Sequence, residues 1–159
     1  MRISPRTAVL AAGLLASVVV AVDQLTKAWA VRLWSAQPET VFGLNWWQLD
    51  VTYNRGASFS LNLGDHFPYV LLGGATVLAL FIWLFRSPAS RWTVLGVGLM
   101  AGGILGNLVD RLRVGAVIDF IEIGWFPVFN LADSSLFCGV VLLVSGYLRQ
   151  ELSKPRASH

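Results

Sequence analysis

Between Gly106-Asn107-Leu108-Val109-Asp110-Arg111 and Phe129-Asn130-Leu131-Ala132-Asp133-Ser134 lies a polar seam in an otherwise apolar chain. This seam, residues 106–134, carries three aspartates, one glutamate and two arginines, although the whole chain is 55% hydrophobic and only 13% charged. Polar groups in apolar surroundings are costly unless they are paired or have a function. Two carboxylates brought together can divide the roles of general acid and general base, so Asp119 and Asp133 are the candidate catalytic pair.

The composition indicates an integral membrane protein. A chain of 159 residues with a mean hydropathy of +0.63 is more apolar than a soluble core of that size requires. We expect a single domain, residues 1–159. The net charge of +3 comes from basic residues scattered at the ends of apolar runs, which argues against nucleic-acid binding. The one cysteine, Cys138, excludes disulfides and cysteine metal sites within the chain.

Four apolar runs predict transmembrane helices at about residues 7–30, 69–85, 92–109 and 132–149. The first run resembles a secretory signal peptide, because Arg2 and Arg6 precede it. Its apolar character continues past Asp23 and Lys27, however, and so it is long enough to span a bilayer. We therefore expect an uncleaved helix and an all-α membrane fold with a small β element.

The distribution of charge predicts the orientation. The side with both termini and the 86–91 hinge holds seven basic residues and one acidic residue, whereas the other side holds five basic and eight acidic residues. By the positive-inside rule the termini are cytoplasmic and the polar seam faces outward. Five of the seven tryptophans lie toward that outer side, as residues of a membrane interface do.

The outer loop, residues 31–67, predicts a small β-sheet. Residues 41–44 and 46–53 are rich in aromatic and β-branched side chains, with turn-forming residues between them. Because irregular backbone cannot face lipid, we expect this sheet to form a platform on the outer (periplasmic) face, beside the polar seam.

The surroundings of the two aspartates predict different roles. Apolar neighbours in Val117-Ile118-Asp119-Phe120-Ile121 favour burial of Asp119, which would raise its pKa and make it the acid. Asn130 is the expected N-cap of the fourth helix, and Asp133 then lies in the first turn. The positive end of the helix favours a charged carboxylate there, so Asp133 is the expected base.

The third apolar run carries small residues at a fixed spacing. Gly98, Gly102 and Gly106 recur at every fourth position, which predicts close packing against another helix. Asn107 and Asp110 are neighbours on one side of the same helix.

The residues alone leave alternatives open. An aspartate at a helix start is often only a cap, and carboxylates at membrane depth also mark ion or proton paths. A small ion- or proton-coupled transporter and a non-catalytic membrane adaptor therefore remain alternatives, although charge clustered at one face favours an enzyme. His66 and His159 are isolated and no phosphate-binding loop is present in the sequence, so we expect neither a metal nor a cofactor.

Five motifs carry a resemblance to a known family: Asp23-Gln-Leu-Thr-Lys27, residues 53–60 (YNRGASFS), residues 106–111 (GNLVDR), residues 117–121 (VIDFI) and residues 129–134 (FNLADS). With these motifs in this order, the chain resembles along its whole length the lipoprotein signal peptidases (signal peptidase II), which are aspartyl proteases of the bacterial inner membrane. One departure is the short segment between the two aspartates, where we expect residues 122–127 to form a compact turn.

The resemblance implies a specific reaction. Members of the family remove the signal peptide from prolipoproteins, cutting just before a cysteine that already bears diacylglycerol, and we expect this chain to act as a monomer in contact with membrane lipid. The catalytic pair of the family maps onto Asp119 and Asp133. The matching supporting positions are Asn54, Gly56, Asn107, Asp110, Arg111, Asn130, Asp23 and Lys27. Of these, Asp23 and Lys27 are expected to have the more structural role.

Overall fold

The computed structural model describes residues 3–36, 42–44, 47–55, 67–86 and 89–152. Within this part, the helices are α1 (Pro5–Ala36), α2 (Phe67–Arg86), α3 (Arg91–Val114) and α4 (Leu131–Leu152). All four are long and apolar enough to cross a membrane. The chain is thus a mostly helical, multi-pass membrane protein, as its composition predicted.

Each helix extends beyond the residues predicted for it, which were 7–30, 69–85, 92–109 and 132–149. Hydropathy marks only the apolar part of a helix, whereas backbone hydrogen bonding continues through polar residues. Helix α3 continues to Val114, where Gly115 ends it in a left-handed conformation with φ 72°. Asp110 and Arg111 therefore lie within the helix, not after it.

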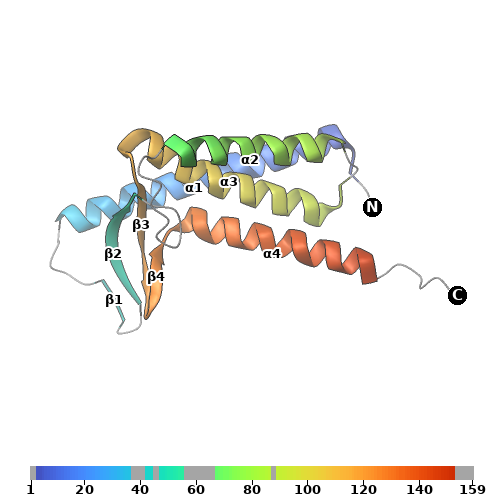
Figure 1. Ribbon diagram of the computed structural model, residues 1–159. Helices are drawn as coiled ribbons and strands as arrows, with labels where there is room; N and C mark the ends of the chain where they lie inside the picture. The colour runs from blue at the N-terminus through green and yellow to red at the C-terminus, as the bar shows by residue number, and fades with distance from the viewer. Residues whose placement is uncertain (1–2, 37–41, 45–46, 56–66, 87–88, 153–159) are drawn as a thin grey trace, which may run out of the picture.

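Helix α3 contacts the other three helices (Figure 1). Its glycines make this possible, because a Cβ atom on Gly102 would lie 2.6 Å from Cβ of Val19 in α1. On the side toward α4, a Cβ on Gly139 would lie 2.7 Å from the backbone oxygen of Gly96. The predicted close packing is confirmed for the face of α3 that meets α1, and glycines also allow close packing between α3 and α4.

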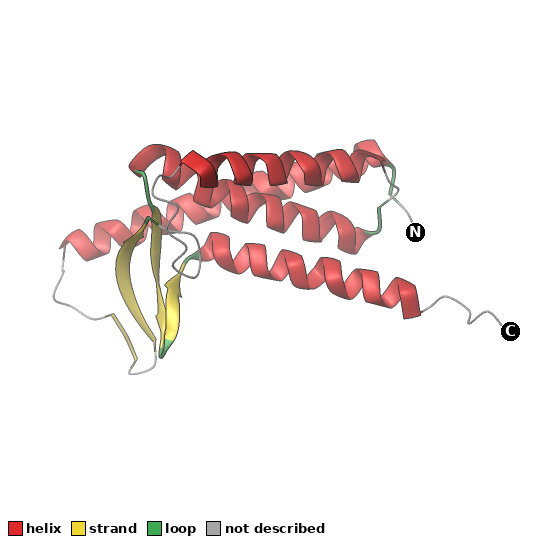
Figure 2. Cartoon of the chain, viewed as in Figure 1, coloured by secondary structure: helices red, strands yellow, loops and turns green. Residues whose placement is uncertain are grey.

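A four-stranded antiparallel sheet stands at the end of the bundle opposite to the chain termini (Figures 1 and 2). Its strands, in sheet order, are β1 (Phe42–Leu44), β2 (Trp47–Asn54), β3 (Val117–Ile123) and β4 (Phe126–Phe129). The strands in the first loop were predicted, but the two from the polar seam were not. Residues 122–127 belong to a hairpin rather than to a turn alone, and Gly124 supplies the positive φ of 54° that its turn uses.

Pairing between β2 and β3 positions the seam. Thr52 lies opposite Asp119, and Asn54 lies opposite Val117. The sheet therefore fixes Asp119 beside β2, in the middle of the first loop, although these segments are far apart in sequence.

Candidate active site

Asp119 and Asp133 converge on one asparagine. The Nδ2 atom of Asn130 donates to Oδ1 of Asp119 at 2.7 Å, and the backbone N–H of Asn130 donates to Oδ2 of Asp133 at 3.3 Å. Asn130 itself is fully buried. Strand β3 and the first turn of α4 therefore bring the two predicted catalytic carboxylates to a common partner.

Asn130 also starts helix α4. Its Oδ1 atom accepts a hydrogen bond from the backbone N–H of Asp133 at 2.9 Å, while Asp133 accepts one from the backbone of Asn130. This reciprocal arrangement is a capping box, and it confirms the predicted N-cap. It also holds the Asp133 carboxylate at the positive end of the helix dipole, where a negative charge is stabilised.

Asp119 lies in a nearly closed environment, with 3% of its surface exposed. Burial raises the pKa of Asp119 from its ordinary value of 3.8 to about 6, and the negative charge of Asp133 acts in the same direction. Hydrogen bonds from Asn54 and Asn130 oppose this rise, and the Asn54 bond to Oδ2 of Asp119 measures 3.2 Å. The direction agrees with the role of acid that the sequence predicted.

Asn107 is the second asparagine of the site. Its Nδ2 atom donates to Oδ1 of Asp133 at 2.8 Å. Its Oδ1 atom accepts from Nδ2 of Asn130 at 3.0 Å and from Nζ of Lys27 at 3.2 Å. Asn107 therefore links the aspartates to a group of charges deeper in the bundle.

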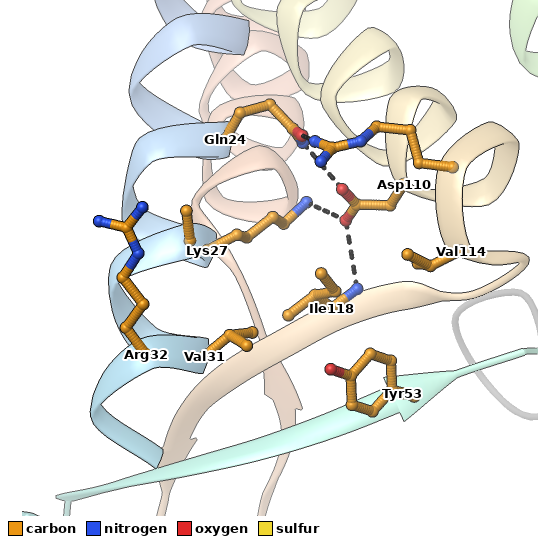
Figure 3. Close-up of a pocket in the computed structure, with 10 residues that line it drawn as sticks. Gln24, Lys27, Val31, Arg32, Tyr53, Asp110, Val114 and Ile118 are labelled. Carbon is orange, nitrogen blue, oxygen red and sulfur yellow. Dashed lines mark hydrogen bonds and ion pairs between the residues drawn. The ribbon is translucent and has the colours of Figure 1, made fainter. Parts of the chain in front are cut away.

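Those charges form a buried ion cluster, which we define as Asp23, Lys27 and Asp110. The ammonium group of Lys27 lies 2.8 Å from Oδ2 of Asp23 and 2.7 Å from Oδ2 of Asp110. The three residues are at most 2% exposed. Figure 3 shows Lys27 reaching from α1 toward Asp110 on α3.

The ion cluster ties the elements of the site together. Asp110 accepts the backbone N–H of Ile118 in β3 at 3.2 Å, and Asp23 accepts that of Ala132 in α4 at 2.9 Å. Charged groups thus satisfy backbone donors at the start of β3 and of α4, and the structural role expected for Asp23 and Lys27 has a geometric basis. Every fully buried side-chain nitrogen and oxygen in the described part of the chain has a hydrogen-bond partner.

A cavity of about 280 Å³ opens beside Asp133, between α2, α3 and α4. Arg111 and Tyr69 line it on the polar side, and the Arg111 guanidinium lies 5.3 Å from the centre of the Tyr69 ring. The rest of the lining is largely apolar, with Leu72, Ile104 and Leu136. The cavity is therefore a largely apolar space with the Asp133 carboxylate in its wall.

Two residues of this region were missed as candidates. Gln24 donates to Oδ1 of Asp110 at 2.8 Å and accepts from Arg113 at 3.1 Å. It stands next to Asp23 and one helical turn before Lys27, and this spacing was the available signal. Tyr69 at the start of the second apolar run offered no signal in the sequence.

The remaining candidate, Gly56, lies outside the described residues. Among the described residues, no group of three or more His, Cys, Asp or Glu side chains is arranged to hold a metal ion.

Known proteins share both the sequence and the fold of this chain. A family profile described as "Signal peptidase (SPase) II" matches residues 15–149. A lipoprotein signal peptidase of Syntrophomonas wolfei is 46% identical over 128 residues, which cover 79% of this chain and 85% of that protein. One of Mycolicibacterium smegmatis is 41% identical over 140 residues, which cover 82% of this chain and 57% of that protein.

A solved structure, described as a bacterial membrane enzyme determined by the in meso method at 2.3 Å resolution, is 27% identical. The match covers 93% of each chain with a TM-score of 0.78. Sequence and fold therefore agree, and the chain belongs to the signal peptidase II family.

Proposed function

We propose that this chain is a membrane aspartic endopeptidase that removes the signal peptide from diacylglyceryl-modified prolipoproteins, cutting just before the lipidated cysteine. Its relatives are named lipoprotein signal peptidases, and its own family is a protease family. The observation that carries the aspartic mechanism is the convergence of Asp119 and Asp133 on Asn130. Family membership gives no support to the ion- or proton-coupled transporter alternative.

The proposed chemistry uses one water molecule between the carboxylates. Asp133 is ionised and held by two N–H donors. It takes a proton from the water while the water oxygen attacks the scissile carbonyl carbon. Asp119, protonated, donates its proton to the carbonyl oxygen, and a tetrahedral diol forms. The diol then returns a proton to Asp119 while Asp133 protonates the leaving amine, so both carboxyl groups regain their starting states.

The surroundings of the pair supply the binding functions. Asn54 and Arg111 orient the peptide by hydrogen bonds, and Gly56, two residues after Asn54 in the sequence, is a further supporting position. The cavity beside Asp133 receives the apolar part of the diacylglyceryl group, because its walls are largely apolar and it lies between the helices. Binding the lipid there aligns the peptide bond with the carboxylates.

We place the protein in the bacterial inner membrane as a single domain and a monomer, with the site toward the outer face. Support comes from the charge distribution, since seven of the twelve basic residues belong to the end that holds the termini and the 86–91 hinge. The sheet, whose strand β3 carries Asp119, and the start of α4, which carries Asp133, lie at the opposite end of the bundle (Figure 1).

The test is cleavage of a purified lipidated precursor, followed by its shift on a gel. Asp119→Asn and Asp133→Asn should each lower kcat by about 1,000-fold or more, because each removes a proton donor or acceptor of the reaction. Glu122→Gln is the matched control, since it makes the same change on strand β3 without a contact to the pair, and it should cleave normally. Retained cleavage by either Asp variant, in protein whose cooperative thermal unfolding shows that it is folded, would refute the aspartic mechanism.

A further inference from the structure

A second cavity, of about 310 Å³, lies between α1, the end of α3 and the sheet (Figure 3). It shares no lining residue with the cavity beside Asp133. Lys27 and Asp110 of the ion cluster line the second cavity, whereas Asn107, which bonds Lys27, lines the first. The ion cluster therefore lies between two cavities, and the proposed reaction uses only one of them.

The second cavity is lined by two guanidinium groups, those of Arg32 on α1 and Arg113 on α3. The carboxylates of the ion cluster, Asp23 and Asp110, pair with Lys27 instead. Among the described residues, neither guanidinium forms an ion pair. Three basic residues and one acidic residue line the cavity, which gives its wall a formal charge of +2, and including Asp23 lowers this charge only to +1. The cavity is therefore suited to an anion.

Arg113 is held in place from the ion cluster through Gln24. Its Nη1 atom donates to Oε1 of Gln24 at 3.1 Å. The Nε2 atom of Gln24 in turn donates to Oδ1 of Asp110 at 2.8 Å and to the backbone oxygen of Gly106 at 3.3 Å. A guanidinium carries five N–H donors in a planar fork, so the bond to Gln24 leaves donors for a ligand. This fork matches the oxygens of a phosphate group, which it binds through two parallel hydrogen bonds.

Donors from three elements surround the second cavity. Figure 3 shows Arg32 on α1 and Tyr53 on β2 at two sides of it, and Arg113 on α3 is a further lining residue. The hydroxyl group of a tyrosine donates a hydrogen bond, and tyrosine is common where a membrane protein meets the headgroups of the lipid. Two guanidinium groups and one phenol can therefore bind the same headgroup.

The surface around the second cavity is apolar, which favours a lipid over a soluble anion. On α1, Leu25 and Trp29 are 70% and 54% exposed, and on α3 the residues on either side of Arg113, Leu112 and Val114, are 65% and 51% exposed. Both helices are long and apolar enough to cross a membrane, so these side chains are placed to contact acyl chains. A phosphate that carries acyl chains satisfies both the charged cavity and its apolar surroundings.

We propose that the second cavity binds an anionic glycerophospholipid, whose phosphate lies between Arg32 and Arg113 and whose acyl chains pack on Leu25 and Trp29. Basic pockets between transmembrane helices are suited to anionic headgroups. The proposal goes beyond the proposed function and does not depend on it. A lipid bound there joins α1 to α3 on the side of the ion cluster that faces away from the proposed catalytic pair.

The test is native mass spectrometry of the full chain in an uncharged detergent, titrated with phosphatidylglycerol. Arg32→Gln and Arg113→Gln should each weaken binding by about 10-fold or more, because each removes charge-assisted hydrogen bonds to the phosphate. Arg55→Gln is the matched control, since Arg55 is exposed directly after β2 and does not line the cavity, and it should bind as the wild type does. Thermal unfolding checks that each variant is folded. Arg32 is exposed, so its variant keeps the test decisive if Arg113→Gln does not fold.

The proposal is overturned if phosphatidylglycerol does not bind in a saturable way, or if all three Arg variants weaken its binding equally. Equal binding of phosphatidylcholine, whose headgroup has no net charge, would also overturn it. Displacement of the lipid by excess inorganic phosphate would mean that the cavity takes a free anion instead of a lipid. Because binding is measured without cleavage, each result holds whether or not Asp119 and Asp133 are catalytic.

Discussion

Asn130 shows how much of the site depends on single side chains. It caps α4 through its Oδ1 atom, bonds Asp119 through its Nδ2 atom and bonds Asp133 through its backbone. The start of a transmembrane helix and the geometry of the proposed catalytic pair are therefore set by the same residue. Because Asn130 is fully buried, no water replaces these contacts when the side chain is shortened.

At the same scale, the raised pKa of Asp119 predicts a pH-dependent penalty on stability. The folded pKa of about 6 lies above the ordinary value of 3.8, so Asp119 contributes stability below about pH 4 that is lost as the pH rises through about 6. An asparagine at position 119 does not titrate, so it loses no stability over this pH range. Relative to wild type, Asp119→Asn should gain about 3 kcal/mol of unfolding free energy between about pH 4 and about pH 8.

The measurement is thermal or denaturant unfolding of both proteins in detergent across this range of pH. Glu122→Gln, which removes a carboxylate from the same strand, is the matched control. A difference between Asp119→Asn and wild type that is constant, or that shrinks as the pH rises, would contradict the burial argument.

At the scale of elements, α3 is the helix on which the others pack, and its glycines allow the approach. A Cβ on Gly106 would lie 2.7 Å from Oδ2 of Asp23, so the absence of a side chain there leaves room for the ion cluster. The absence of a side chain on Gly102 likewise leaves room for Val19 of α1, because a Cβ on Gly102 would lie 2.6 Å from Cβ of Val19. Close packing and buried charge are therefore parts of one interface between α1 and α3.

This interface predicts opposite effects for two glycine substitutions. Gly102→Ala should destabilise the protein by about 1–3 kcal/mol, because the added methyl group overlaps Val19 and the backbone of Ala16. Gly74→Ala in α2 is the control, since nothing lies within 4 Å of its Cβ position, and it should stabilise by about 0.5–1 kcal/mol through helix propensity.

Unfolding in detergent, monitored by circular dichroism, compares the two variants under one condition. Equal effects of the two substitutions would mean that the contact between α1 and α3 is not as close as the structure has it.

At the scale of the whole molecule, the site joins two environments. The sheet stands at the end of the bundle opposite to the chain termini, where α1 runs on past it (Figure 2). The cavity beside Asp133 lies between α2, α3 and α4 and is lined largely by apolar side chains. In the proposed reaction, a peptide would approach from the side of the sheet while its lipid stays between the helices. The scissile bond would then be held where the two regions meet.

This arrangement predicts that the lipid is needed for efficient cleavage. A precursor without the diacylglyceryl group should have a kcat/KM lower by about 100-fold, because contact in the cavity no longer aligns the peptide bond. The comparison uses one peptide sequence with and without the lipid, at detergent concentrations that keep both in solution. Equal cleavage of the two forms would show that the cavity has no part in substrate alignment.

The sequence was enough to predict the helices and the first two strands, and its motifs are the origin of the proposal that Asp119 and Asp133 are catalytic. Hydropathy is a local property, so runs of apolar residues reveal membrane helices without knowledge of their neighbours. The motifs likewise contained polar residues that the structure brings together, from Asp23 to Asp133. Strands β3 and β4 escaped prediction because half of their environment is supplied by β2, which is distant in sequence.

Only the tertiary structure decided how these residues are connected. Asp23 meets the backbone of Ala132 across a separation of 109 residues, and Lys27 meets Asn107 across 80 residues. Such contacts depend on the relative register of α1, α3 and α4, which glycine-mediated packing sets and no local pattern records. The partners of each carboxylate, and with them the chemical difference between Asp119 and Asp133, therefore follow from helix packing rather than from the order of residues.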